Sequence, residues 1–150
     1  MTVSIERIQE LADDAAERSL AVAHARYERS ATTAPLDWAS RMTAFIAAGR
    51  IDLFVARSAG EPVGYATLTR GVSTWDAVPY GYLDCLFVAE GHRSSGLGVL
   101  LIEAVVARSR ELGLGELQWQ TPEWNDGAIR FYERLGATRL AKQRFTLAVG

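Results

Sequence analysis

Cysteine is almost absent from the sequence, which contains only Cys85. A single cysteine excludes an internal disulfide and any metal site built from several cysteines, and it suits a reducing compartment. Long hydrophobic runs are also missing, since no stretch approaches the roughly 18 apolar residues of a membrane span. Glu6 interrupts the N-terminal region, where a signal peptide needs an apolar core. We therefore expect a cytoplasmic protein with no membrane partner and no metal ion.

A surplus of positive charge is lacking as well. Sixteen Lys and Arg residues stand against eighteen Asp and Glu residues, which gives a formal net charge of −2. Nucleic acids and anionic membranes are attracted by a positive field, so this balance argues against both as partners. Hydrophobic residues make up 49% of the chain and charged residues 23%, as in ordinary globular proteins. The length of 150 residues predicts one domain spanning residues 1–150.

Hydrophobic periodicity predicts a chain of alternating strands and helices. The order is β-α-α-β-β-β-α-β-α-β, and the short AGE segment between the second and third strands indicates a hairpin. We expect an α/β (α+β) domain with about four helices around a mixed, mostly antiparallel sheet that turns parallel after Val88. The predicted strands are 2–8, 52–58, 62–70, 80–88, 116–121 and 139–149, and the predicted helices are 11–30, 32–50, 97–112 and 125–136.

The segment GHRSSGLG, residues 91–98, lies between a predicted strand and a predicted helix. Its glycines free backbone N–H groups at the positive end of the helix dipole, where anions bind. Three interpretations are open: an ordinary turn, the phosphate loop of a dinucleotide-binding domain, or the pyrophosphate loop of a coenzyme A enzyme. The dinucleotide motif G-x-G-x-x-G lacks its third glycine here, because Val-Leu-Leu follows Gly98. Three preceding antiparallel strands also fit a parallel dinucleotide sheet poorly.

Two motifs resemble the GNAT superfamily of N-acetyltransferases. Residues 93–98, RSSGLG, resemble the superfamily's Q/R-x-x-G-x-G/A motif for the pyrophosphate of acetyl-CoA. Residues 123–137, EWNDGAIRFYERLGA, are similar to its downstream motif N-x-x-A-x-x-F-Y-x-x-x-G. Residues 73–88 and 118–137 further resemble the diamine and thialysine acetyltransferase branch. The resemblance implies a single-domain GNAT fold and transfer of an acetyl group from acetyl-CoA, the co-substrate, directly to a primary amine.

The resemblance also implies where acetyl-CoA binds. Backbone N–H groups from Arg93 to Val99 are expected around the pyrophosphate, with the Arg93 side chain and nearby hydroxyls as further donors. The pantetheine arm is expected to pair with an open edge at Leu86–Val88, as a peptide adds to a sheet. A backbone N–H near Phe87 then stabilises charge on the thioester carbonyl. The expected cofactor residues are Leu86, Phe87, Val88, Arg93, Ser94, Ser95, Gly96, Leu97, Gly98, Val99, Asn125 and Tyr132.

Two residues are candidates for proton transfer. Tyr132 matches the motif's tyrosine and is the candidate acid for the departing thiolate, because a phenol has a pKa near 10 and a thiol near 8.5. Packing in the apolar stripe of its helix is the alternative. The acceptor amine must lose a proton before it attacks, either to a base or to a water chain that leads to solvent. Asp84 is the candidate base, with a buried structural role as the alternative. Strand alternation predicts Asp84 on the face of Leu86 and opposite Cys85.

The acceptor is the least defined part of the prediction. Trp75 and Asp76 occupy the branch's substrate-side segment and are expected to line the pocket together with Asp84. The branch has two adjacent acids where this chain has Asp84 and Cys85, which weakens the case for a polyamine. A small-molecule amine is expected, such as an amino acid side chain or a diamine, or else a protein or peptide amine.

Other functions stay open beside this one. The alternative function is a non-catalytic acyl-CoA-binding sensor, and the third is a dinucleotide-binding domain. An acyl-cysteine at Cys85 with His24 or His92 as base is a further interpretation, although a cysteine in mid-strand is more often a small core residue. A homodimer is usual in the branch.

Overall fold

The structure is a computed structural model that describes residues 2–150, and these form two compact units. The first unit ends at Gln120 and the second spans Thr121–Gly150. None of the helices in the described residues is long and apolar enough to cross a membrane. In chain order the elements are β1 (Val3–Ile8), α1 (Glu17–Tyr27), α2 (Trp38–Ala47), β2 (Asp52–Ser58), β3 (Glu61–Ser73), β4 (Val78–Val88), α3 (Leu97–Glu111), β5 (Leu117–Gln118) and α4 (Asp126–Arg134).

The sheet of the first unit has the strand order β1-β2-β3-β4-β5. The first four strands pair antiparallel, and β5 pairs parallel to β4 after the crossover through α3. The predicted mixed, mostly antiparallel sheet is therefore confirmed. The predicted hairpin between β2 and β3 turns through Ala59 and Gly60, with φ angles of +50° and +85°. Two consecutive positive φ angles are typical of the tight turns whose twist matches the paired strands.

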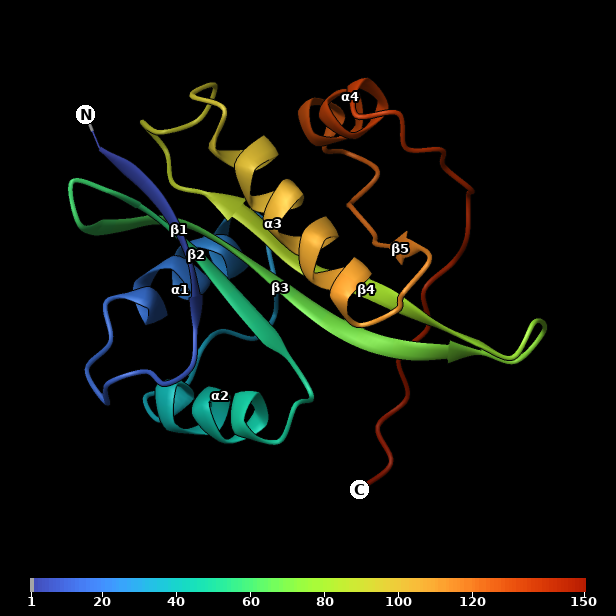
Figure 1. The fold of residues 1–150 in the computed structure, drawn as a ribbon, viewed down its shortest axis with the longest axis horizontal. Helices are drawn as coiled ribbons and strands as arrows, with labels where there is room; N and C mark the ends of the chain where they lie inside the picture. Colours follow the sequence, from blue (N-terminus) through green and yellow to red (C-terminus); the bar gives the residue numbers. More distant parts are fainter. Residues whose placement is uncertain (1) are drawn as a thin grey trace. The chain divides into compact units, whose positions relative to one another are not determined.

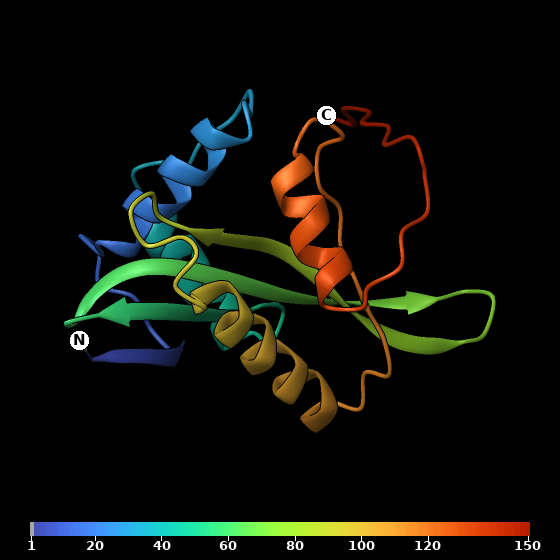
Figure 2. The ribbon, with the colours of Figure 1, turned by 90° about the horizontal axis from the view of Figure 1, so that it is seen from above.

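Helices cover both faces of this sheet (Figures 1 and 2). Strand alternation divides β2, so that Leu53 and Val55 pack with α1 and α2, while Phe54 and Ala56 pack with α3. The apolar face of α3 carries Leu101, which is completely buried, as the helical periodicity of this segment predicts. The α1–α2 face and the α3 face of the sheet thus each have their own hydrophobic core.

A β-bulge interrupts the pairing of β3 with β4. Thr67 lies opposite Cys85 and Leu68 lies opposite Leu83, so that Asp84 has no partner in the ladder. One extra residue in a strand shifts the alternation of side chains beyond it by one position. Leu83 and Leu86, three positions apart, accordingly pack on the same α3 face of the sheet.

The second unit contains α4, which begins and ends next to the residues that the sequence predicts as its cap and its stop. Asn125 precedes the helix, and its side-chain oxygen accepts a hydrogen bond from the Ala128 N–H at 3.2 Å. Gly136 follows the helix with a φ of +88°. The predicted strand at 139–149 is wrong, because residues 137–150 form neither helix nor strand. Alternating apolar residues favour a strand, but they do not supply the second strand that its backbone groups need.

Candidate active site

The loop between β4 and α3 turns its backbone at three positive φ angles. Gly91, Ser94 and Gly96 have φ values of +89°, +63° and +83°. Gly96 is the N-cap of α3, and no side chain caps this helix. The Leu100 N–H donates to the Gly96 carbonyl at 3.1 Å, so the N–H groups of residues 97–99 precede the first intrahelical bond. These donors at the positive end of the helix dipole fit a pyrophosphate.

The Arg93 side chain points from this loop back toward β4 and α1. Its Nε donates to the Val88 carbonyl oxygen at 2.9 Å. The guanidinium carbon lies 4.6 Å from the ring centre of Tyr27 and 5.5 Å from that of Phe87. The Ser95 hydroxyl likewise donates within the loop, to the His92 carbonyl. Arg93 therefore fastens the loop to β4 and α1, while its contact with a phosphate stays a prediction.

The C-terminal half of β4 has an open edge in the first unit. On the side of β5, the ladder of β4 includes only Gly81 and Tyr82, so none of the strands among residues 2–150 pairs with β4 beyond that point. The Ala89 N–H donates to the Val63 carbonyl at 2.8 Å. Because antiparallel pairs alternate, Phe87 then directs its backbone groups toward β3, and Leu86 and Val88 direct theirs toward the open edge. A backbone N–H that stabilises the thioester carbonyl is expected near Phe87. The N–H groups that point outward there are those of its two neighbours, Leu86 and Val88.

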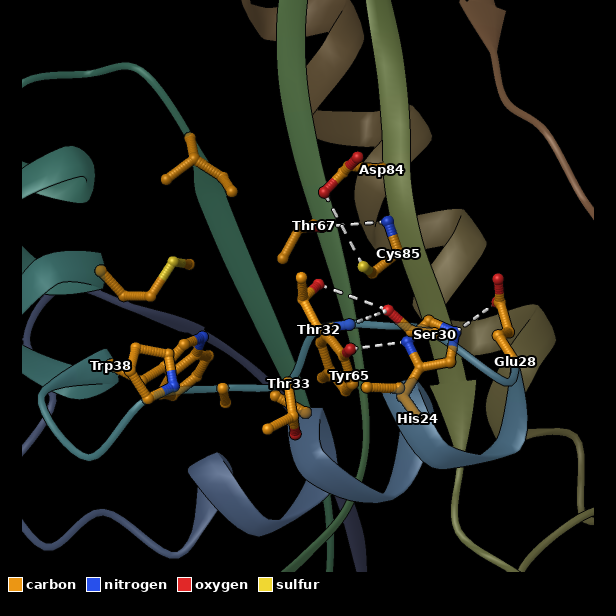
Figure 3. A pocket seen from close by; sticks show the side chains of 16 residues that line it. His24, Glu28, Ser30, Thr32, Thr33, Trp38, Tyr65, Thr67, Asp84 and Cys85 are labelled. Atoms are coloured by element: carbon orange, nitrogen blue, oxygen red, sulfur yellow. Dashed lines mark hydrogen bonds and ion pairs between the residues drawn. The ribbon is translucent and has the colours of Figure 1, made fainter. Parts of the chain in front are cut away.

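A pocket of about 440 Å³ lies at the α1–α2 face of the sheet (Figure 3). Its walls come from α1, the segment between α1 and α2, α2 itself, and the strands β3 and β4. Its lining includes the acids Glu28 and Asp84, and none of the lining residues is Lys or Arg. Trp38 and Tyr65 add aromatic surface. Acidic and aromatic groups together favour a positively charged ligand.

The bulge in β4 gives this pocket its carboxylate. Asp84 and Cys85 both line the pocket, whereas Leu86 packs on the opposite face of the sheet. The prediction that Asp84 lies on the face of Leu86 and opposite Cys85 is therefore wrong, because strict alternation does not hold across a bulge. The Cys85 thiol lies 3.8 Å from Asp84 Oδ2, and the backbone N–H of Cys85 donates to Thr67 Oγ1 at 3.0 Å. Asp84 is exposed, which also argues against the buried structural role.

A hydrogen-bonded chain crosses the pocket wall from Tyr65 to Glu28 (Figure 3). His24 Nδ1 lies 2.6 Å from the Tyr65 hydroxyl, and Nε2 lies 2.6 Å from Glu28 Oε2. The sequence suggests His24 only as a base for Cys85, and it predicts no role for Tyr65 or Glu28. The i, i+4 spacing of His24 and Glu28 is visible in the sequence, but their meeting with β3 depends on how α1 packs.

Burial governs the protonation of two pocket groups. It raises the pKa of the Cys85 thiol to about 12, with the negative charge of Asp84 as the next cause. Burial also raises the pKa of Tyr65 far above its ordinary value, and Cys85 and Asp84 add to the effect. Both groups are therefore protonated at neutral pH. A protonated thiol is a poor nucleophile, which argues against an acyl-cysteine at Cys85.

The remaining predicted residues lie outside this pocket's lining. Trp75 is 97% exposed at the tip of the β3–β4 hairpin, and Asp76 follows it there. Asn125 and Tyr132 belong to the second unit, where Asn125 caps α4 and the rings of Phe131 and Tyr132 are 5.5 Å apart. The substrate and catalytic roles expected for these residues stay predictions.

Comparison with known proteins places the chain in a family. The model of the acetyltransferase (GNAT) family matches residues 6–137. The chain belongs to the acetyltransferase (GNAT) family, as the two motifs at residues 93–98 and 123–137 predict.

Relatives and solved structures agree with this assignment. An L-ornithine N5-acetyltransferase of Arabidopsis thaliana is 36% identical over 69 residues, which cover 46% of this chain and 30% of that protein. A thialysine N-epsilon-acetyltransferase of Caenorhabditis elegans is 28% identical over 89 residues, covering 59% and 55%. The chain thus spans 30% to 55% of the length of these two relatives. A ribosomal-protein-alanine N-acetyltransferase of Brucella melitensis biovar Abortus 2308 shares the fold, with a TM-score of 0.73, 18% identity and coverage of 99% and 100%.

Proposed function

We propose that this protein transfers the acetyl group of acetyl-CoA directly to the primary amine of a small molecule. The observation that carries this proposal is the bulge that turns the Asp84 carboxylate into a pocket whose lining has no Lys or Arg. A primary amine is an ammonium ion at neutral pH, because its pKa is near 10.4. An acidic pocket with aromatic walls attracts such a cation and repels anionic metabolites.

The residues around α3 and β4 suit acetyl-CoA, which supplies the acetyl group as a thioester when bound. The uncapped N–H groups at the start of α3 would bind the pyrophosphate, in the loop from Arg93 to Val99. The outward N–H groups of Leu86 and Val88 and the outward carbonyl of Leu86 would bind the amides of the pantetheine arm, while the Val88 carbonyl accepts from Arg93. One of these N–H groups would also donate to the thioester carbonyl oxygen.

Two side chains complete the proposal. Asp84 attracts the ammonium group and orients the amine toward the part of the open edge at Leu86–Val88, which begins two residues further along β4. Tyr132 donates a proton to the departing thiolate, as the family motif implies. We propose that both units form one acetyltransferase domain over residues 1–150, an interpretation supported by a family match that runs across both.

The names of the relatives suggest the class of acceptor. Ornithine and thialysine are amino acids that carry an amine on the side chain, and a pocket of about 440 Å³ suits a molecule of that size. We therefore propose an amino acid side chain or a diamine as the acceptor. A protein or peptide amine is the second candidate, and a homodimer in the cytoplasm stays our expectation from the branch.

Release of coenzyme A with a panel of primary amines tests this function. The panel contains ornithine, thialysine, simple diamines and an N-terminal peptide, and acetyl-CoA affinity is measured in parallel by calorimetry. We expect turnover with at least one side-chain amine. Tight binding of acetyl-CoA without turnover of any amine would instead indicate an acyl-CoA sensor. Displacement of the bound cofactor by NAD but not by coenzyme A would refute the proposal.

A further inference from the structure

His24 is a buried titratable group that the proposed function leaves without a role. It is 7% exposed, and it lies in the last turn of α1, where the helix dipole favours a cation. Both of its ring nitrogens have partners at 2.6 Å, which are Tyr65 and Glu28. Both partners line the pocket, as His24 itself does, and the Glu28 side chain is 40% exposed.

The chemistry of the partners gives these hydrogen bonds a direction. A carboxylate only accepts hydrogen bonds, so in the neutral ring His24 Nε2 carries the proton and donates to Glu28. The other nitrogen, Nδ1, then has a free lone pair and accepts from the Tyr65 hydroxyl. Tyr65 therefore connects the pocket to a basic nitrogen that is held in one tautomer.

We propose that Tyr65, His24 and Glu28 form the general base that removes the proton from the acceptor ammonium group. This inference rests on the proposed function and assigns its deprotonation step. Tyr65 lines the pocket and would contact the amine, while His24 acts through Tyr65, and Glu28 is a positioning residue. Asp84 retains the role of attracting the ammonium group. An imidazole matches proton transfer near neutral pH better than a carboxylate does.

The proposed step conserves protons and charge. The ammonium N–H bond breaks as its proton moves to the Tyr65 oxygen, and the Tyr65 proton moves to His24 Nδ1. The amine becomes neutral, Tyr65 remains a phenol, and His24 becomes an imidazolium that donates to the Glu28 carboxylate. After the product leaves, the proton returns by the same path to water that enters the pocket. No tyrosinate forms, which agrees with the raised pKa of the buried Tyr65.

Charged and titratable groups surround His24 on several elements. Its own helix end contributes the acid Glu28, and β4 contributes the acid Asp84 and the protonated thiol of Cys85 next to Tyr65. The ring of Phe87 stacks on the imidazole, with centres 5.0 Å apart. The cation Arg93 lies against Phe87, with its guanidinium carbon 5.5 Å from the ring centre. Trp38 and Met42, the lining residues from α2, do not titrate in this pH range.

The pH dependence of kcat/KM tests the general base. The variants are His24→Gln and Tyr65→Phe, measured from pH 6 to pH 10 with the best amine of the panel. We expect each to lower kcat/KM by about 100-fold at pH 7, the ordinary contribution of a general base. The loss should shrink toward pH 10, where the free amine is already neutral. The double variant should be no worse than either single variant, because both break one path.

Several outcomes separate a proton-transfer role from a structural one. A loss that is the same at every pH would overturn the proposal, as would additive losses in the double variant. Glu28→Gln keeps the size of a half-exposed side chain, so this variant tests the proposal if the buried variants unfold. We expect it to lower kcat/KM by about tenfold. His92→Gln removes the other histidine. It should leave the pH dependence of kcat/KM on the acidic side unchanged.

Two measurements, the affinity for acetyl-CoA and nitrogen NMR, do not depend on turnover. The affinity for acetyl-CoA should be unchanged in all of these variants. Absence of turnover by the unaltered protein would refute the proposed function itself, separately from the general base. Nitrogen NMR of the two histidines should show the Nε2–H tautomer for His24, and Glu28→Gln should disturb that signal. The opposite tautomer would contradict the hydrogen-bond direction on which the proposal depends.

Discussion

Asp84 and Cys85 are neighbours in β4, and both line the same pocket although successive residues of a strand normally face opposite sides. The bulge opposite Thr67 causes this arrangement, because Asp84 is an extra residue without a ladder partner. The two side chains nevertheless behave differently. Asp84 is exposed, whereas burial keeps the Cys85 thiol protonated.

Asp84→Asn removes the negative charge but keeps the shape of the side chain. We expect the KM for a cationic amine to rise about tenfold, which corresponds to the loss of roughly 1.4 kcal/mol of ion attraction. Steady-state kinetics with the best amine of the panel measures the change. Asp13→Asn, an exposed position before α1, makes the same change in net charge and serves as the control. An unchanged KM would remove Asp84 from the acceptor site.

Gly96→Asp tests the pyrophosphate loop. We expect the dissociation constant of acetyl-CoA to rise at least about tenfold, because a carboxylate would stand where phosphate oxygens bind. Calorimetry measures the affinity. Gly96 also has a φ of +83°, so backbone strain must be separated from charge repulsion. Gly113→Asp introduces the same charge at a φ of +72° after the other end of α3, and it should leave the affinity unchanged.

Tyr132→Phe tests the proposed proton donor. We expect kcat to fall by about 10- to 100-fold while the affinity for acetyl-CoA is preserved, because the ring remains and only the hydroxyl is lost. Tyr80→Phe, near the tip of the β3–β4 hairpin, removes a hydroxyl at a site without an assigned role. Equal kcat values for the unaltered protein and Tyr132→Phe would return Tyr132 to a packing role.

The Cys85 thiol makes stability depend on pH in the alkaline range. Its pKa is about 12 in the folded chain and near 9 in the unfolded chain, so the folded state holds the proton more tightly. The contribution of the thiol to the free energy of unfolding is complete below pH 9 and is lost as the pH rises toward 12, with an upper bound of about 4 kcal/mol. Denaturant unfolding between pH 8 and pH 11 measures this decline. Cys85→Ala should flatten it, leaving the part that Tyr65 contributes, and a decline of equal slope would contradict the assignment.

The sequence by itself determined the features that depend on short, contiguous stretches. The loop at residues 93–98 and the helix starting after Asn125 identified the family, because each motif is read within a few residues. Local patterns predicted the four helices and five strands of the described residues, since each element selects its buried face from its own residues, but they placed the starts of the first two helices at 11 and 32, where the structure has Glu17 and Trp38. The strand predicted at 139–149 failed because a strand also needs a partner that periodicity does not describe.

Tertiary structure alone decided the chemistry of the pocket. The bulge at Asp84 reverses the predicted face of that side chain, and its cause is the pairing of β4 with β3 rather than the local sequence. The contact between His24 and Tyr65 joins residues 41 positions apart, and it exists because α1 packs on β3. Hydrogen bonds between distant segments depend on packing geometry to within fractions of an ångström. Patterns along the chain do not encode that geometry, which is why the proposed general base emerged only from the folded structure.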